Sequence, residues 1–211
     1  MSSVYSTEQA IRHIPDYSQD HEQGHILKAL AGVTKGRFLD IGAYHPTDLS
    51  NTRGLYELGW EGVLVEPSPA PMISLMKEYG RDSRITLLQA LVAPGHEGGC
   101  RSMVVTDGPY STIDPSNFSK WKNHVGYYAQ VMIPIIPLKA LLQMGPFDFI
   151  DIDVEGGSKD LFVGMLDLQV RPKCVCVEYD EHRAEIETRA KASNYSQIYI
   201  NAVNVIFARN D

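Results

Sequence analysis

The chain has 211 residues, 44% of them hydrophobic and 21% charged, which is the balance of one globular domain and excludes a largely disordered protein. Its 19 basic and 26 acidic residues give a net charge of −7 with no basic run, and this argues against a nucleic-acid partner. No apolar run approaches the ~20 residues of a membrane span, and the polar N-terminus lacks the features of a signal peptide.

The three cysteines indicate a reducing compartment. Cys174 and Cys176 lie at alternate positions of an apolar run, where a strand would set both thiols on one face but too far apart to bridge easily. The odd number of cysteines also leaves at least one thiol unpaired. Together with the absence of a signal peptide, this predicts a cytoplasmic protein with buried, reduced thiols.

The first part of the chain alternates between helices and strands, which is the pattern of a parallel sheet with helices on its faces. It begins with a polar arm. Hydrophobic periodicity and the placement of glycine and proline then predict helices over 21–31, 52–58 and 69–79 and strands over 37–41, 62–66 and 85–92.

Residues 95–129 interrupt this alternation. They contain glycines, prolines and a group of aromatic residues, and their length is unusual for a connection in a compact domain. The stretch is predicted to be a long, functional or mobile loop. Two roles are open for its aromatic residues: they could cover a sugar ring with their apolar faces, or they could anchor the loop by packing. These residues are Tyr110, Phe118, Trp121, Tyr127 and Tyr128.

The alternation resumes after this loop and ends in a predicted antiparallel hairpin around Asn201 and Ala202. The sequence therefore predicts an α/β sandwich with a mostly parallel sheet of about seven strands, the last of them antiparallel. Its domains would be an arm and helix over 1–36 and a single domain over 37–211. The remaining expected elements are strands at 131–136, 147–154, 174–178, 197–200 and 203–208 and helices at 137–144, 159–166 and 181–192.

Ligands of open α/β sheets bind beyond the carboxyl ends of the strands, so the residues that follow each strand carry the functional signal. Gly42 follows the first strand and allows a ligand to approach the backbone closely. A dinucleotide site would continue with glycines where Tyr44 and Thr47 stand, so the sequence disfavours NAD or FAD. Glu66 ends the second strand, where an acid binds the two hydroxyls of a ribose. One glycine turn and one acid fit S-adenosylmethionine better than a dinucleotide.

Three acids, Asp151, Asp153 and Glu155, alternate with Ile152 and Val154 at the end of the strand over 147–154. In one interpretation all three share a face, and carboxylates so close raise the pKa of one another, which suits a general base or a hard cation. In the other, only the last one or two leave the sheet and the first is bonded inside it.

Several segments resemble the FkbM-type methyltransferases. Residues 38–46 (Phe-Leu-Asp-Ile-Gly-Ala-Tyr-His-Pro) are similar to the first motif of that family, and residues 152–156 (Ile-Asp-Val-Glu-Gly) match its I-D-x-E-G signature. The most specific match is the run Ser-Asn-Thr over 50–52, followed by Gly-Trp-Glu-Gly over 59–62 and Val-Glu-Pro over 65–67. Tyr-Ser-Gln over 17–19, with Glu22, resembles the family's N-terminal arm.

This resemblance implies a Rossmann-like methyltransferase sandwich that binds S-adenosylmethionine and transfers its methyl group to oxygen. The methionine end, the ribose and the adenine of the cofactor would lie in turn along the ends of the first three strands, with the arm closing over them. The cofactor-binding residues implied in this way are Gln19, Asp40, Gly42, Ala43, Tyr44, Ser50, Glu66, Ser68, Gln89, Ala90, Leu91 and Asp151.

The resemblance places Asp153 where related O-methyltransferases have a catalytic or metal-binding acid, with Glu155 close by. His182, like His45 and His124, is an alternative base because histidine titrates near neutral pH. If a divalent metal binds, Asp153 and Glu178 are its candidate ligands. The metal-binding relatives have Asp-Asn where residues 178–180 are Glu-Tyr-Asp, so we do not expect one.

The expected function is in-line methyl transfer from S-adenosylmethionine to a hydroxyl of a small molecule or sugar, aided by alignment and a nearby base. Ser111 and Thr112 lie in the segment where contacts with the acceptor are expected. Two alternatives remain: a nucleotide-dependent oxidoreductase or epimerase of the NAD type, and a non-catalytic protein that binds S-adenosylmethionine.

Overall fold

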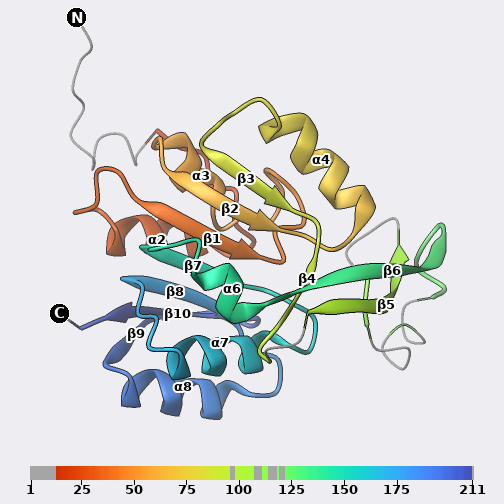
Figure 1. Cartoon of the computed structure of the whole chain (residues 1–211). Helices are drawn as coiled ribbons and strands as arrows, with labels where there is room; N and C mark the ends of the chain where they lie inside the picture. Colours follow the sequence, from red (N-terminus) through yellow and green to blue (C-terminus); the bar gives the residue numbers. More distant parts are fainter. Residues whose placement is uncertain (1–12, 96–97, 107–110, 114–117, 119–121, 211) are drawn as a thin grey trace, which may run out of the picture.

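A seven-stranded sheet forms the centre of the computed structural model, which describes residues 13–95, 98–106, 111–113, 118 and 122–210 (Figure 1). All its neighbouring strands are parallel except those that pair with β10, which runs antiparallel to both neighbours. The predicted fold class is thus confirmed, and so is the terminal hairpin. In spatial order the strands are β3 (Ile85–Leu88), β2 (Glu61–Val65), β1 (Arg37–Ile41), β7 (Phe149–Ile152), β8 (Cys174–Glu178), β10 (Asn204–Arg209) and β9 (Tyr195–Ile200).

Helices cover both faces of this sheet, which is why its central strands are continuous apolar runs. Successive side chains of β1 go to opposite sides, so that Phe38 and Leu39 belong to different core clusters. One face carries α6 (Leu138–Leu142), α7 (Ser158–Asp167) and α8 (Arg183–Ala192), and the other carries α2 (Glu22–Ala29), α3 (Arg53–Glu57) and α4 (Pro69–Tyr79). No helix in the described ranges is long and apolar enough to cross a bilayer.

The described part of the N-terminal arm, with its helix α2, shares a core with the sheet. Ile26 and Leu27 of α2 are buried with residues of α3 and α4, and α2 also contacts β8, β9 and β10. Ser50 donates its backbone N–H to the carbonyl oxygen of Tyr17 at 2.9 Å, which ties the arm to the turn before α3. The arm therefore lies beside the carboxyl ends of the central strands, where ligands bind in this class of fold.

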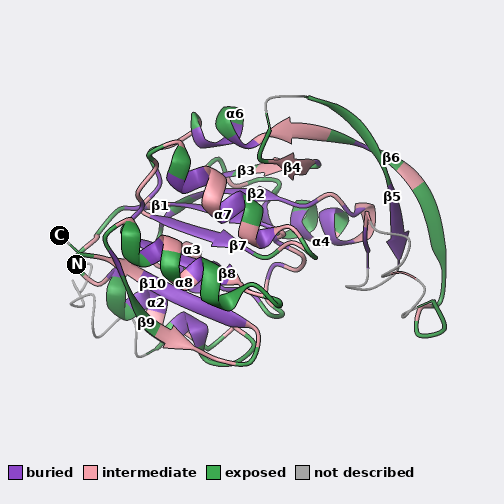
Figure 2. Ribbon diagram, turned by 90° about the horizontal axis from the view of Figure 1, so that it is seen from below, coloured by how far each residue is buried: buried purple, intermediate pink, exposed green. Residues whose placement is uncertain are grey.

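The stretch from 95 to 129, expected to be a loop, contains regular structure. The strand predicted over 85–92 divides after β3, and its second part, β4 (Leu91–Ala93), joins a second, three-stranded sheet with β5 (Gly99–Thr106) and β6 (Tyr128–Pro137). The β5–β6 hairpin projects from the body of the molecule (Figures 1 and 2). Residues around Tyr110 and Trp121 lie outside the described ranges.

The strand predicted over 131–136 lies within β6, whereas β5 and the first residues of β6 are not predicted, because burial along them does not alternate. The first half of β5 is exposed and the second half is buried, whereas β6 is exposed over most of its outer half (Figure 2). A small core of Met103, Val105 and Ile133 holds the sheet together. The exposed Cys100 on β5 also corrects the expectation that all thiols are buried, which holds for Cys174 and Cys176.

Candidate functional site

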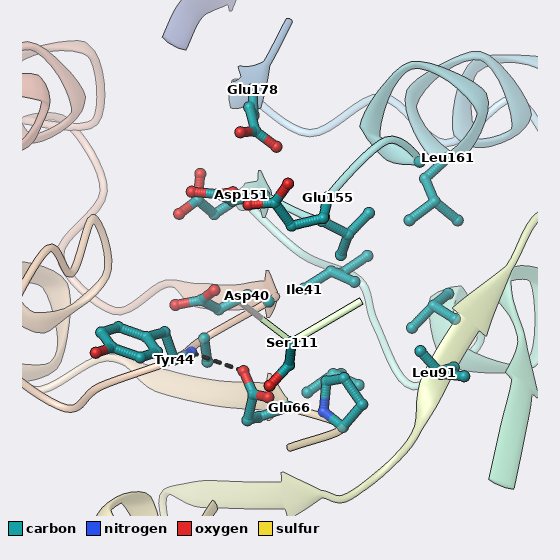
Figure 3. Close-up of a pocket in the computed structure, with 18 of the residues that line it drawn as sticks. Asp40, Ile41, Tyr44, Glu66, Leu91, Ser111, Asp151, Glu155, Leu161 and Glu178 are labelled. Carbon is teal, nitrogen blue, oxygen red and sulfur yellow. Dashed lines mark hydrogen bonds between the residues drawn. The ribbon is translucent and has the colours of Figure 1, made fainter. Parts of the chain in front are cut away.

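A cavity of about 500 Å³ lies at the carboxyl ends of β1, β2, β7 and β8 and at the start of β10 (Figure 3). The order of the sheet reverses between β1 and β7, and ligands of open α/β sheets bind at such a switch point. Residues of the second sheet and of the segment that follows β5 complete the cavity. Leu91 lies on β4 and Met103 on β5, and Ser111 and Thr112 lie in the segment after β5. The cavity therefore has walls from both sheets.

Gly42 forms the floor of the cavity where the chain leaves β1. Its φ is +99°, a conformation that residues with a side chain rarely adopt. A Cβ atom here would lie 1.7 Å from the carbonyl oxygen of Asp153, because the turn after β1 presses against the chain leaving β7. The N–H groups of Gly42 and Ala43 both donate to the carbonyl oxygen of Val65, at 2.9 and 3.1 Å. Only glycine fits this close approach.

Glu66 follows β2 and faces the cavity with its carboxylate fixed by the backbone. Its Oε2 accepts the N–H of Tyr44 at 3.0 Å (Figure 3). Its Oε1 accepts the N–H of Ser68 at 2.6 Å. The side chain is buried, and burial raises its pKa, as does the charge of Asp153. The Ser68 side chain also forms a hydrogen bond with this carboxylate. Three protein groups thus bond a carboxylate that offers about four lone-pair sites, which leaves acceptor capacity for a ligand hydroxyl.

Asp40 and Asp151 lie side by side on β1 and β7 and are both buried. Thr52 donates its hydroxyl to Asp40 at 2.6 Å, and Asn51 donates its amide to Asp151 at 3.4 Å. Burial raises the pKa of Asp40 to about 7, helped by the charges of Asp153 and Glu66. Burial also raises the pKa of Asp151 well above its ordinary value. Of the three acids after residue 150, the first is therefore held inside the sheet, as one of the two interpretations expects.

Asp153 and Glu178 form a hydrogen-bonded pair of carboxyl groups beyond β7 and β8. Enclosure by the surrounding protein raises the pKa of both groups, that of Glu178 to about 9, and the charge of Asp153 contributes to the latter. Glu178 is consequently protonated at neutral pH and can donate to Asp153. Glu155 also lines the cavity, on the same side as Asp151 and Glu178 (Figure 3), and its charge contributes to the raised pKa of Glu178. A carboxylate held in this way can accept a proton from a ligand hydroxyl.

The buried position of Asp40 leads to a prediction about stability. Its pKa is higher in the folded chain than the ordinary 3.8, so folding takes up a proton and the free energy of unfolding falls as the pH rises through this window to about 7. Asp40→Asn removes the charge and keeps an oxygen for the Thr52 hydroxyl. We expect the variant, without ligand at pH 8, to melt about 2–4 °C higher than the wild type, which corresponds to ~1 kcal/mol for a chain of this size.

Thermal melts at pH 5 and pH 8 test this prediction, since the gain should shrink at the lower pH. Asp48→Asn is the control, because Asp48 lies near the same turn but its side chain is 75% exposed. A variant that melts below the wild type at pH 8 would contradict the assignment of Asp40 as a destabilising buried carboxyl.

The structure brings most of the sequence-predicted residues to one cavity. All of the expected residues but two line this cavity. Those that line it are Gln19, Asp40, Gly42, Ala43, Tyr44, Ser50, Glu66, Ser68, Ala90, Leu91, Asp151, Asp153, Glu155 and Glu178.

Gln89 and His182 are the two exceptions. Gln89 is exposed and lines a separate hollow beside α4, because successive residues of an extended chain point to opposite sides and Ala90 faces the cavity. His182 is exposed at the start of α8 and does not line the cavity. The alternative bases His45 and His124 do not line it either. The expectation of a histidine base is therefore not supported by the geometry.

Sequence reasoning missed several residues of the cavity. Asn51 lies inside the Ser-Asn-Thr motif, which indicated the family but assigned no role to this residue. Glu22 lies in the matched arm and is fully buried, whereas Asn204 and Arg101 gave no signal at all. The acidic residues give little support to a metal site. Within the described ranges no group of three or more His, Cys, Asp or Glu side chains is arranged to hold one.

Comparisons with known proteins identify one family and several structures of similar fold. The family model described as "Methyltransferase FkbM domain" matches residues 40–199. No curated protein matches the chain significantly.

Among solved structures, the Escherichia coli protein yhhF has 13% sequence identity and a TM-score of 0.53, over 94% of this chain and 89% of its own. The precorrin-6Y C5,15-methyltransferase of Geobacter metallireducens GS-15 has 10% identity and a TM-score of 0.52, over 90% and 86%. The C-terminal domain of the Rhodobacter capsulatus precorrin-6Y C5,15-methyltransferase has 15% identity and a TM-score of 0.50, over 98% and 97%. At these identities the likeness concerns the fold.

Proposed function

Since the chain belongs to the FkbM methyltransferase domain family, we propose that it transfers the methyl group of S-adenosylmethionine to a hydroxyl of a small molecule or carbohydrate. The observation that carries the proposal is a single cavity, within the described residues, that joins a glycine turn and a backbone-fixed Glu66 to the carboxyl group of Asp153. We take residues 37–211 as the cofactor-binding domain, with Gln19 and Glu22 of the arm closing one side.

The residues of the cavity fit the nucleoside half of S-adenosylmethionine. Glu66 keeps acceptor capacity for a ribose hydroxyl beside its bonds to Tyr44 and Ser68, and Gly42 lines the same cavity where the chain leaves β1. Ala90 and Leu91 offer an apolar surface next to Ser68 for the adenine ring. The chain has Tyr44 and Thr47 in place of the glycines that cradle a pyrophosphate, which disfavours the NAD-type alternative.

The charged half of the cofactor also finds suitable partners. Asn51 is buried, lines the cavity and has a side-chain oxygen without a hydrogen-bond partner among the described residues. This oxygen and the carboxyl groups of Asp40 and Asp151 suit the ammonium group and the sulfonium of the cofactor. An unpaired buried acceptor is costly, so a donor from the ligand would stabilise the site.

When bound, S-adenosylmethionine supplies an electrophilic methyl carbon, whose bond to sulfur breaks as the bond to the acceptor oxygen forms. The protein has to align the acceptor hydroxyl with this carbon and exclude water. Asp153 is the proposed base that takes the hydroxyl proton, and Glu178 supports it by donating a hydrogen bond. Glu155 is a second carboxylate within the same wall. We assign no step to a metal.

Isothermal titration calorimetry with S-adenosylmethionine and with NAD tests the proposal. We expect saturable binding of the first and none of the second. Binding of NAD alone would overturn the proposed function, and binding of S-adenosylmethionine without turnover of any hydroxyl compound would favour the non-catalytic alternative.

Glu66→Gln is expected to weaken S-adenosylmethionine binding about 10- to 100-fold. The substitution removes charge-assisted hydrogen bonds to the ribose, worth ~1.5–3 kcal/mol, and sets an NH2 group against the N–H of Tyr44 or Ser68. The same calorimetric titration measures the change. Glu61→Gln is the matched control, since Glu61 is an exposed glutamate at the opposite end of β2. Wild-type affinity in Glu66→Gln would remove Glu66 from the binding site.

A further inference from the structure

Asn204 at the start of β10 is a buried polar residue whose hydrogen bonding is incomplete. It is 3% exposed and lines the cavity. Its side-chain nitrogen donates to Oε1 of Glu22 at 2.9 Å, whereas its side-chain oxygen has no hydrogen-bond partner among the described residues. Buried polar atoms of this kind are nearly always satisfied in folded proteins, so an unpaired oxygen on a residue that lines a cavity points to a donor that arrives with a ligand.

The surroundings of Asn204 define the charge of that ligand. Glu22 is fully buried, and although burial works to raise its pKa, hydrogen bonds from Asn204, Asn201 and the N–H of Asp20 outweigh it and lower the pKa. Glu22 is therefore an anion next to the unpaired oxygen. Glu178 is the register partner of Asn204 on β8. Among the described residues that line the cavity, the positively charged side chain is Arg101, which lies on β5 of the second sheet.

The position of Asn204 in the sheet assigns this ligand group to the acceptor. Gly42 and Glu66, which would hold the cofactor, follow β1 and β2. From β1 the order runs through β7 and β8 to β10, so at ~4.8 Å per strand Asn204 lies about 14 Å from β1 and about 19 Å from β2. Asn204 therefore lies beyond the proposed ribose site, on the side of the cavity where Asp153 and Glu178 lie.

We propose that Asn204, with Glu22 and Glu178 beside it, forms a subsite for a second hydrogen-bond donor of the acceptor, next to the hydroxyl that is methylated. The inference rests on the proposed function and specifies its substrate class. A polyhydroxylated or amino-hydroxylated molecule offers a hydroxyl to Asp153 and a neighbouring hydroxyl or ammonium to the oxygen of Asn204. A phosphate or carboxylate at this place would meet the oxygen of Asn204, which only accepts hydrogen bonds, and would be repelled by Glu22.

Saturation-transfer NMR on the full chain loaded with S-adenosylhomocysteine tests this subsite, because the product cofactor fills the first site and permits no reaction. The probes are D-glucose, D-glucosamine, D-glucuronate and D-glucose 6-phosphate, which share a ring and differ in charge. We expect the neutral and cationic sugars to bind in the millimolar range, and the two anionic sugars to bind at least tenfold more weakly.

Asn204→Ala is expected to weaken glucose and glucosamine binding at least tenfold and to leave the affinity for S-adenosylhomocysteine within twofold. Asn201→Ser is the matched control. Asn201 donates to the same Glu22 oxygen, at 2.6 Å, but does not line the cavity. A serine hydroxyl can still accept the N–H of Val203, which Asn201 now accepts at 2.8 Å. In both variants Glu22 keeps the N–H of Asp20 and one asparagine, so the arm should remain folded.

Three results would overturn the subsite: equal binding of the anionic sugars, unchanged sugar binding in Asn204→Ala, or no saturation transfer to any of the four sugars in the wild type. Each leaves the proposed methyl transfer intact as long as calorimetry finds S-adenosylmethionine bound. A chain that does not bind S-adenosylmethionine or S-adenosylhomocysteine would instead overturn the proposed function.

Discussion

Gly42→Ala is expected to abolish detectable S-adenosylmethionine binding and to destabilise the fold by about 2–4 kcal/mol. A left-handed conformation costs a residue with a side chain ~1–2 kcal/mol. The larger effect comes from the new Cβ, which would lie 1.7 Å from the carbonyl oxygen of Asp153 and force β1 and β7 apart at the switch point. Calorimetry and thermal melting measure the two losses.

Gly59→Ala separates backbone strain from the clash. Gly59 also has a positive φ, +86°, but the nearest atom to its Cβ would be Nη1 of Arg84 at 3.9 Å, far from a clash. It ends the turn after α3 and does not line the cavity. We expect this variant to lose ~1–2 kcal/mol of stability and to bind the cofactor normally. If Gly42→Ala behaved like Gly59→Ala, the close approach at the floor of the cavity would have no role in binding.

Asp153→Asn is expected to lower the rate of methyl transfer by about 10²- to 10⁴-fold, the usual contribution of a positioned base. The side chain keeps its size, so cofactor affinity should change only a few-fold. The readout is S-adenosylhomocysteine formation with the best acceptor from a screen of hydroxyl compounds. The pKa of Asp153 is raised, so the wild-type rate should fall on acidification above the ordinary carboxyl range, and this limb should vanish in the variant.

Asp160→Asn is the matched control for this experiment. Asp160 also lines the cavity, but it is exposed and forms an ion pair with Nζ of Lys159 at 2.7 Å. Its neutralisation should leave the rate and its pH profile almost unchanged. Wild-type rates in Asp153→Asn would require another base, and the histidines His45, His124 and His182 do not line the cavity.

The sequence was sufficient to predict the main sheet and the acidic wall of the site. Apolar runs bounded by glycine and proline mark buried parallel strands, so β1 and β8 begin and end as expected. Acids that end such strands face the same edge of the sheet, which brings Glu66, Asp153 and Glu178 to one cavity. The Ser-Asn-Thr motif also has a physical basis, since Thr52 donates to Asp40.

The features that were missed depend on contacts distant in sequence. Asn204 is recognisable only when β10 is inserted between β8 and β9, which brings it to Glu22 of the arm. Burial along β5 and the first residues of β6 does not alternate, so these parts of the second sheet resemble a loop in sequence, whereas the strand expected over 131–136 lies within β6. Gln89 and His182 are near strand ends, but nearness along the chain does not fix the side to which a side chain points.

The acidic wall of the cavity has a further consequence. Asp40, Asp151, Asp153 and Glu178 all have raised pKa values, with burial as the main cause. Each group is therefore unfavourable as a buried anion, and a positively charged ligand would stabilise its ionised form. The proposed affinity for the cationic cofactor and the expected gain in stability of Asp40→Asn would then have the same origin.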